Sequence, residues 1–106
     1  MIIPEKLKRG DMGRVIAPAT SLAIISEANQ EIARARLAAL GLRLSFGQHV
    51  GEQSAFDSSS IRSRLADLHA AFADPAVRLV LAVIGGYNSN QLLRHIDWEL
   101  VRRNPK

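Results

Sequence analysis

One stretch of the sequence, Val77 to Ile84, constrains the fold more than any other. Its only polar side chain is Arg78, and it leads directly into the pair Gly85-Gly86. A short, nearly continuous apolar run bounded by turn residues is typical of a strand covered on both faces in a parallel sheet. We therefore predict a central parallel strand over 77–84, followed at once by a tight turn.

The segments before and after this run alternate between strand and helix patterns. Strands are predicted at 14–17 and 42–46, and helices at 26–40, 60–73, 91–93 and 96–103. This order, with short connections, predicts an open, mostly parallel α/β sheet with flanking helices. Apolar residues at helical spacing predict the faces of the first two helices that pack on the sheet. These residues are Ala28, Ile32, Ala35, Ala39 and Leu40 in the first helix, and Ile61, Leu65, Leu68 and Phe72 in the second.

Composition narrows the class of protein. The 106 residues are enough for one domain, and 47% hydrophobic with 23% charged residues is typical of a globular chain. No apolar run approaches the roughly 20 residues of a membrane-spanning helix, and no secretory signal is visible. The absence of cysteine excludes disulfides, thiolate metal sites and a cysteine nucleophile. We expect a cytoplasmic protein that does not bind membranes.

The charge pattern does not favour nucleic-acid binding. The net charge is +4, but the arginines are scattered along the chain rather than clustered on one element. Aromatic residues make up only 5% of the chain, so no stacking platform for bases is expected. If the protein did bind nucleic acid, its affinity for DNA would fall steeply as the salt concentration rises.

Two loops are candidates for a functional site. In open parallel sheets, ligands bind beyond the carboxyl ends of the strands. Two loops follow predicted strands at that edge, namely Pro18–Ser21, which offers hydroxyl groups, and Gly85–Asn90. We expect both to line one cleft.

Ser89 is the candidate nucleophile in the second of these loops. A serine in a tight turn between a buried strand and a helix, a nucleophile elbow, is lifted above the sheet edge. The backbone N–H of Asn90 would then lie near a helix N-terminus, and that of Gly86 would be a second donor to a developing oxyanion. Tyr87 and Asn88 are expected to shape the turn or to touch the substrate.

The motif leaves an alternative open. The common pattern Gly-x-Ser-x-Gly is absent, because Tyr87 and Gln91 occupy the flanking positions. In a non-catalytic α/β ligand-binding domain, Ser89 would merely cap a helix. The glycine-rich motifs of nucleotide-binding loops are also absent.

The histidines do not complete a catalytic set. A serine needs a base, and the candidates are His49 in a polar loop, His69 in the second helix and His95 six residues after Ser89. Each is better explained as an ordinary histidine, and their spacing does not match a metal site. No triad can be assembled from this sequence.

Several ordered motifs resemble the N-terminal domain of the LD-carboxypeptidase family of serine peptidases. The form Asn88-Ser89-Asn90 resembles its microcin-immunity branch more than its murein-recycling branch. The similarity covers nearly the whole chain and is carried by Lys8–Asp11, Val15–Pro18, Leu40–Leu42, Arg64–His69, Phe72–Pro75, Gly85–Leu93, Ile96–Trp98 and Asn104–Lys106.

This resemblance implies a Ser-Glu-His hydrolase with Ser89 as the nucleophile. In the family the Glu and His come from a C-terminal domain, so residues 1–106 would be an N-terminal half that is inactive alone. Family members cut an amide next to a free carboxylate, in murein tetrapeptides or peptidyl-nucleotide antibiotics. They need no metal or organic cofactor, are commonly homodimers and act in the cytoplasm.

Overall fold

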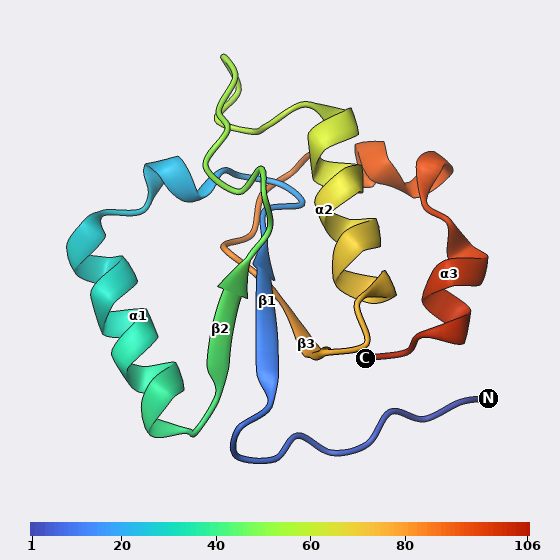
Figure 1. The fold of residues 1–106 in the computed structure, drawn as a ribbon. Helices are drawn as coiled ribbons and strands as arrows, with labels where there is room; N and C mark the ends of the chain where they lie inside the picture. The colour runs from blue at the N-terminus through green and yellow to red at the C-terminus, as the bar shows by residue number, and fades with distance from the viewer.

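The computed structural model describes all residues, Met1–Lys106. It has three strands and three α-helices, with two short 3₁₀ helices between them (Figure 1). In chain order these are β1 (Met12–Ile16), η1 (Leu22–Ile24), α1 (Glu27–Ala39), β2 (Arg43–Phe46), α2 (Ile61–Ala73), β3 (Val77–Ala82), η2 (Ser89–His95) and α3 (Trp98–Arg103). The predicted alternation of strands and helices is confirmed.

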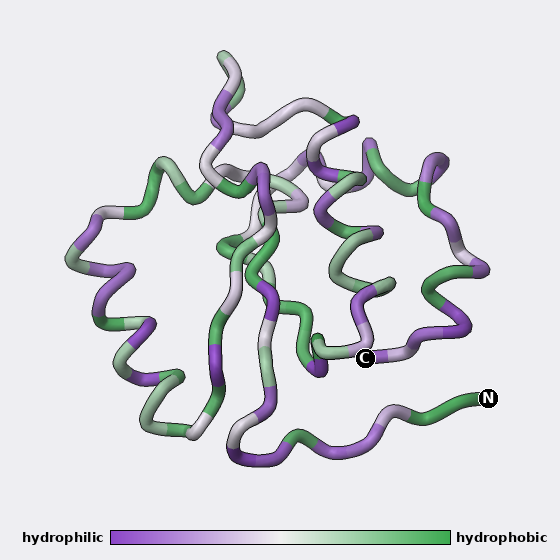
Figure 2. The backbone as a smooth tube through the Cα atoms, in the orientation of Figure 1, coloured by the Kyte–Doolittle hydropathy of each residue, from purple (hydrophilic) through white to green (hydrophobic).

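The strands form one parallel sheet in the order β2-β1-β3. The predicted open parallel α/β sheet is therefore confirmed, but the predicted position of β3 is wrong. The central strand is β1, which is hydrogen-bonded on both sides, whereas β3 is at the edge of the sheet. Although β3 is hydrophobic along most of its length (Figure 2), its residues 79–81 are only half-buried and Ile84 beyond it is 43% exposed.

Helix α1 lies on one face of the sheet and α2 on the other, with α3 packed beside α2 (Figure 1). The predicted ends of α1 are confirmed. The Ser26 hydroxyl accepts a hydrogen bond from the N–H of Asn29 at 3.2 Å, and Gly41 follows the helix with a φ of 86°. The predicted apolar stripe is wrong, since Ile32 is 51% and Leu40 66% exposed. A different face, which includes Leu37, points toward the sheet. The helix is so rich in alanine that its periodicity does not distinguish the two faces.

Helix α2 begins and ends close to the predicted residues. The hydroxyl of Ser60 caps it by accepting from the N–H of Ser63 at 3.0 Å. Its buried residues are Arg64, Asp67 and Ala71. The predicted stripe lies beside this face and is less buried than expected, with Ile61 38% exposed.

The core lies between α2 and the sheet and at the carboxyl ends of the strands. Its buried apolar residues are Val15, Ile16, Ala17, Ala19, Val50, Ala71, Val77 and Leu92. None of the helices combines the length and the apolar character that crossing a membrane requires.

An ion pair links the start of the sheet to the end of α2. The Arg14 Nη2 donates to Asp74 Oδ2 at 3.1 Å, and the Arg14 Nε donates to Ser45 Oγ at 2.7 Å. The N–H of Ala76 and, to a smaller extent, the Arg14 guanidinium hold the pKa of Asp74 below its ordinary value. This carboxylate therefore stabilises the fold above its unfolded pKa of about 3.9, and the contribution is lost as the pH falls through the folded pKa.

We expect Asp74→Asn to weaken the acid dependence of stability. The variant should be less stable than the wild type at neutral pH, and its unfolding midpoint should fall less steeply between about pH 5 and pH 2. Thermal unfolding followed by circular dichroism measures this. Glu31→Gln, at an exposed position of α1, is the control. Parallel pH profiles for Asp74→Asn and the wild type would contradict the prediction.

Candidate functional site

Three loops gather beyond the carboxyl ends of the strands (Figure 1). They are residues 17–21 after β1, 47–60 after β2 and 83–88 after β3. The N–H of Ser21 donates to the carbonyl of Asp57 at 2.7 Å, which joins the first two loops. The loops after β1 and β3 are in contact at Gly86. That both loops line one cleft stays a prediction.

Gly86 packs directly against the loop after β1. A Cβ atom at this position would lie 2.6 Å from the Ala19 Cβ and 3.0 Å from the Thr20 Oγ1. Neither Gly86 nor Gly85 has a positive φ, so the requirement for glycine at position 86 is close approach rather than an unusual dihedral angle. At Gly85 a Cβ would meet nothing within 4 Å.

Ser89 is exposed at the first residue of η2 and its side chain makes no hydrogen bond within the chain. The backbone N–H groups of Gly86 and Asn90 also have no partner within the chain. The turn therefore presents a free hydroxyl together with free N–H donors close to it in sequence. The helix that follows the turn is the 3₁₀ helix η2, and Ser89 does not have a positive φ, which among non-glycine residues is found only at Asp57.

Ser89 does not cap a helix, so that part of the alternative reading is wrong. The N-cap of η2 is Asn88, and no side-chain capping bond is present. The Asn88 side chain instead donates to Ser58 Oγ at 2.7 Å. Asn88 is 9% exposed, so it shapes the turn from within, whereas Tyr87 is 80% exposed and points to solvent.

The free energy of unfolding distinguishes a serine that caps a helix from a serine that does not support the fold. We expect Ser60→Ala to destabilise the chain by about 1 kcal/mol, because Ser60 caps α2. Ser89→Ala should change stability by less than about 0.5 kcal/mol, as at other exposed positions. Denaturant unfolding measures both. Equal losses in the two variants would mean that Ser89 supports the fold after all.

The loop after β1 contributes less chemistry than expected. Ser21 is fully buried, and its hydroxyl donates to the carbonyl of Val50 and accepts from the N–H of Ala23, both at 3.1 Å. Its hydroxyl is thus engaged within the fold and not offered to a cleft. Thr20 is the hydroxyl of this loop that lies beside the turn, against Gly86.

A polar hollow of about 220 Å³ lies beside the turn. Tyr87, Asn88 and Gln91 line it on one side. The remaining lining residues come from the loop after β2 and from α2, namely Ser54, Phe56, Ser58, Ser59 and Arg64. Hydroxyl groups, two amides and a guanidinium thus surround a space beside the turn that carries Ser89.

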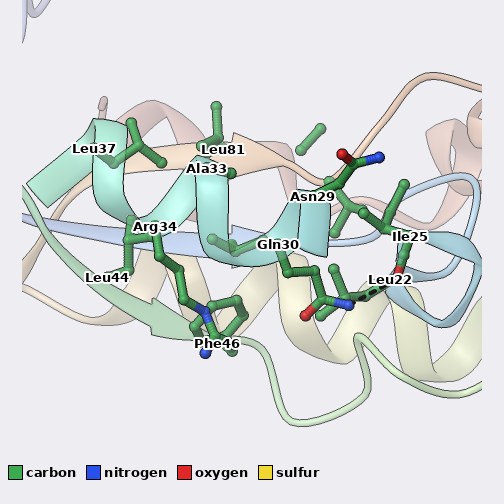
Figure 3. A pocket seen from close by; sticks show the side chains of 13 residues that line it. Leu22, Ile25, Asn29, Gln30, Ala33, Arg34, Leu37, Leu44, Phe46 and Leu81 are labelled. Atoms are coloured by element: carbon green, nitrogen blue, oxygen red, sulfur yellow. Dashed lines mark hydrogen bonds between the residues drawn. The ribbon is translucent and has the colours of Figure 1, made fainter. Parts of the chain in front are cut away.

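A second, smaller hollow of about 110 Å³ lies between α1 and the sheet (Figure 3). It is mostly apolar, and the Arg34 guanidinium at its rim lies 5.1 Å from the centre of the Phe46 ring. The Gln30 side chain donates to the carbonyl of Ile25 at 2.9 Å. This hollow contains no nucleophile and no acid or base, so we do not regard it as the site of chemistry.

None of the three histidines is hydrogen-bonded to Ser89. His49 pairs with Glu52, and His69 Nε2 accepts from the N–H of Asp97 at 3.0 Å. His95 is exposed at the last residue of η2. No cluster of acidic and histidine side chains suited to a metal ion is present.

Glu52 links the loop after β2 to α2. Its carboxylate accepts from Ser63 Oγ at 2.8 Å as well as from His49. The Ser63 hydroxyl, followed by His49, lowers the pKa of Glu52. His49 therefore has a structural role, because its contact with Glu52 helps to hold the loop after β2 in place.

Sequence reasoning missed one residue of the site, Arg64. It is 4% exposed and lines the polar hollow from α2. In the sequence it is one of several scattered arginines, and its residue type does not mark it as buried. The available signal was the spacing of Arg64, Asp67 and Ala71, which places all of them on one face of α2.

The fold and this turn define a class, a parallel α/β domain that presents a serine at the carboxyl edge of its sheet. The sequence model described as the LD-carboxypeptidase N-terminal domain matches residues 14–106. The chain therefore belongs to the LD-carboxypeptidase family.

Similar proteins agree with this assignment. YocD of Bacillus subtilis (strain 168), which is named as a carboxypeptidase, is 50% identical over 102 residues, covering 96% of this chain and 31% of YocD. The crystal structure of an MccF-like protein from Bacillus anthracis is 50% identical, with a TM-score of 0.98, covering 100% of this chain and 32% of that protein. The microcin C7 self-immunity protein MccF, in complex with aspartyl sulfamoyl adenosine, has the same fold at 23% identity, with a TM-score of 0.91 over 100% of this chain and 32% of MccF. The chain spans about a third of the length of these relatives.

Proposed function

We propose that this chain is the nucleophile-bearing N-terminal part of a serine carboxypeptidase that cleaves an amide next to a free carboxylate. The observation that carries the proposal is the exposed, unbonded Ser89 hydroxyl in a turn where the N–H groups of Gly86 and Asn90 are free. Membership of the LD-carboxypeptidase family and the carboxypeptidase name of YocD support the same activity.

In the proposed reaction the Ser89 oxygen attacks the carbonyl carbon of the amide. Its proton passes to a histidine of a C-terminal domain, oriented there by a glutamate, and the resulting oxyanion accepts hydrogen bonds from the N–H groups of Gly86 and Asn90. Collapse of the intermediate releases the amine, which takes the proton from the histidine. Water then hydrolyses the acyl-enzyme and restores Ser89.

The substrate we propose is a peptide or a peptidyl nucleotide with a free carboxylate. The structural match to an MccF-like protein and the aspartyl sulfamoyl adenosine complex of MccF support the peptidyl-nucleotide class. Residues 1–106 alone should be inactive, because the histidine and glutamate are supplied from outside them. We further propose that the full-length protein acts in the cytoplasm as a homodimer.

Labelling with a fluorophosphonate tests the proposal. The probe should modify the protein that carries the proposed C-terminal part, and peptide mass spectrometry should locate the adduct on Ser89. Heat-denatured protein and residues 1–106 alone are the controls that should remain unlabelled, since an unactivated serine reacts slowly. An adduct elsewhere, or none in an intact protein, would reject the proposed nucleophile.

A panel of substrates then resolves the class. An aspartyl sulfamoyl nucleotide and a murein tetrapeptide would each be incubated with the protein that carries the C-terminal part. If only the nucleotide substrate is cleaved, with release of its amino acid, the protein belongs with the microcin-immunity branch. If only the tetrapeptide is cleaved, with release of its terminal D-alanine, the protein belongs with the murein-recycling branch.

A further inference from the structure

A single buried side chain connects the loops of the candidate site. Arg64 is 4% exposed, and its guanidinium forms four hydrogen bonds. The acceptors are the carbonyl of Ser59 at 3.0 Å, the carbonyl of Pro18 at 3.1 Å, the carbonyl of Asn88 at 3.2 Å and the Oε1 atom of Gln91 at 2.7 Å. These acceptors come from the loops after all three strands and from the start of η2.

Two of these contacts flank the proposed nucleophile. Asn88 immediately precedes Ser89, and Gln91 follows it by two residues. One rigid, planar fork therefore holds the chain on both sides of Ser89 and ties it to the loop after β1 through Pro18. No other side chain makes a hydrogen bond to the backbone of the turn 85–90.

The burial of this guanidinium needs an explanation, because Arg64 has no carboxylate partner among the ion pairs of the chain. A buried cation without an acid is costly unless its N–H groups are satisfied. Desolvation accordingly lowers the pKa of Arg64, with no acidic group opposing it. The cost of burying this charge is offset by hydrogen bonds to neutral oxygen atoms. The guanidinium in turn fixes the positions of these oxygen atoms.

We infer that Arg64 is the positioning residue that sets the geometry of the Ser89 turn, an inference that rests on the proposed function. It does not touch the reacting atoms. It holds the backbone of Asn88 and the side chain of Gln91 so that the Ser89 hydroxyl and the neighbouring N–H groups keep one arrangement. Lysine cannot replace it, because an ammonium group has three donors at one point and no planar fork.

Steady-state kinetics of Arg64→Lys and Arg64→Met test this role in the protein that carries the C-terminal part. Small displacements of catalytic groups cost about 100-fold in rate, so we expect kcat to fall by about that factor. KM should change by less than about threefold, because the hydrogen bonds of the Arg64 guanidinium go to atoms of the chain itself. Labelling of Ser89 by a fluorophosphonate should slow in parallel with kcat.

Two controls separate positioning from a general loss of stability. Arg62→Met removes an exposed arginine from the same helix and should leave kcat and KM unchanged. Val77→Ala removes buried volume from β3, far from the loops, and should lower the unfolding temperature while leaving kcat intact when assayed below that temperature. A kcat of Arg64→Lys within twofold of the wild type, or a fall of kcat in Val77→Ala as large as that in Arg64→Met, would overturn the inference.

A second pair of variants keeps the test decisive if Arg64→Met does not fold. Gln91→Ala removes one acceptor from the guanidinium at an exposed position, and kcat should fall by about tenfold, whereas Gln91→Glu retains an acceptor and should keep most of the wild-type kcat. Equal kcat in the two variants would contradict the inference.

Ser89→Ala is measured alongside these variants. Residual turnover in Ser89→Ala rejects the proposed function, whereas an inactive Ser89→Ala with unaffected Arg64 and Gln91 variants rejects only the role of Arg64.

Discussion

Ser89→Ala is expected to abolish turnover in the protein that carries the proposed C-terminal part. Loss of the nucleophile in a serine hydrolase reduces kcat on the order of 10⁶-fold, because no other group can form the acyl-enzyme. The fold should be unaffected, since Ser89 is exposed and makes no hydrogen bond within the chain. Amino-acid release from the substrate and the unfolding midpoint would be measured on the same preparation.

Asn90→Ala is the matched control for this prediction. It removes the neighbouring side chain but keeps the backbone N–H that we propose as an oxyanion donor. Turnover should therefore stay within about tenfold of the wild type, well above that of Ser89→Ala. Substantial turnover in Ser89→Ala would remove Ser89 from the mechanism and leave a binding domain as the better description.

Gly86→Ala is expected to impair catalysis by separating two loops. The added methyl group would lie 2.6 Å from the Ala19 Cβ, so either the turn or the loop after β1 must move. Displacing the Gly86 N–H from its proposed place beside the oxyanion should lower kcat by about 10²–10³-fold. Overpacking at this contact should also destabilise the protein by about 1–3 kcal/mol.

Two further variants test whether the contact itself is the cause. Gly85→Ala should be nearly neutral, because a Cβ there meets nothing within 4 Å. The double variant Ala19→Gly with Gly86→Ala removes the opposing Cβ and should recover much of the lost stability and activity. No recovery in the double variant, or an equal loss in Gly85→Ala, would show that steric contact with Ala19 is not responsible.

Local patterns predicted the elements well. The cap Ser26, the start of α2 near Ser60, the glycine that ends α1 and the apolar run of β3 all depend on neighbours in the sequence, and each is found close to the predicted residue. The turn that carries Ser89 is predicted for the same reason, as an apolar strand followed by glycines. The position of β3 in the sheet was not predictable from these patterns, because hydrophobicity does not specify which strands become neighbours.

The sequence by itself determined the parallel α/β class, the approximate bounds of its main elements and the turn after β3 that carries a serine, because these follow from periodicity, capping and turn chemistry within a few residues. Only the tertiary structure decided that Arg64 is buried, that Gly86 touches Ala19 and that the Ser21 hydroxyl is hydrogen-bonded within the fold. The partners of Arg64 lie 5 to 46 residues away in the chain. Contacts of that kind arise when three strand ends meet at one edge of a sheet, which is a property of the packed chain rather than of any local pattern.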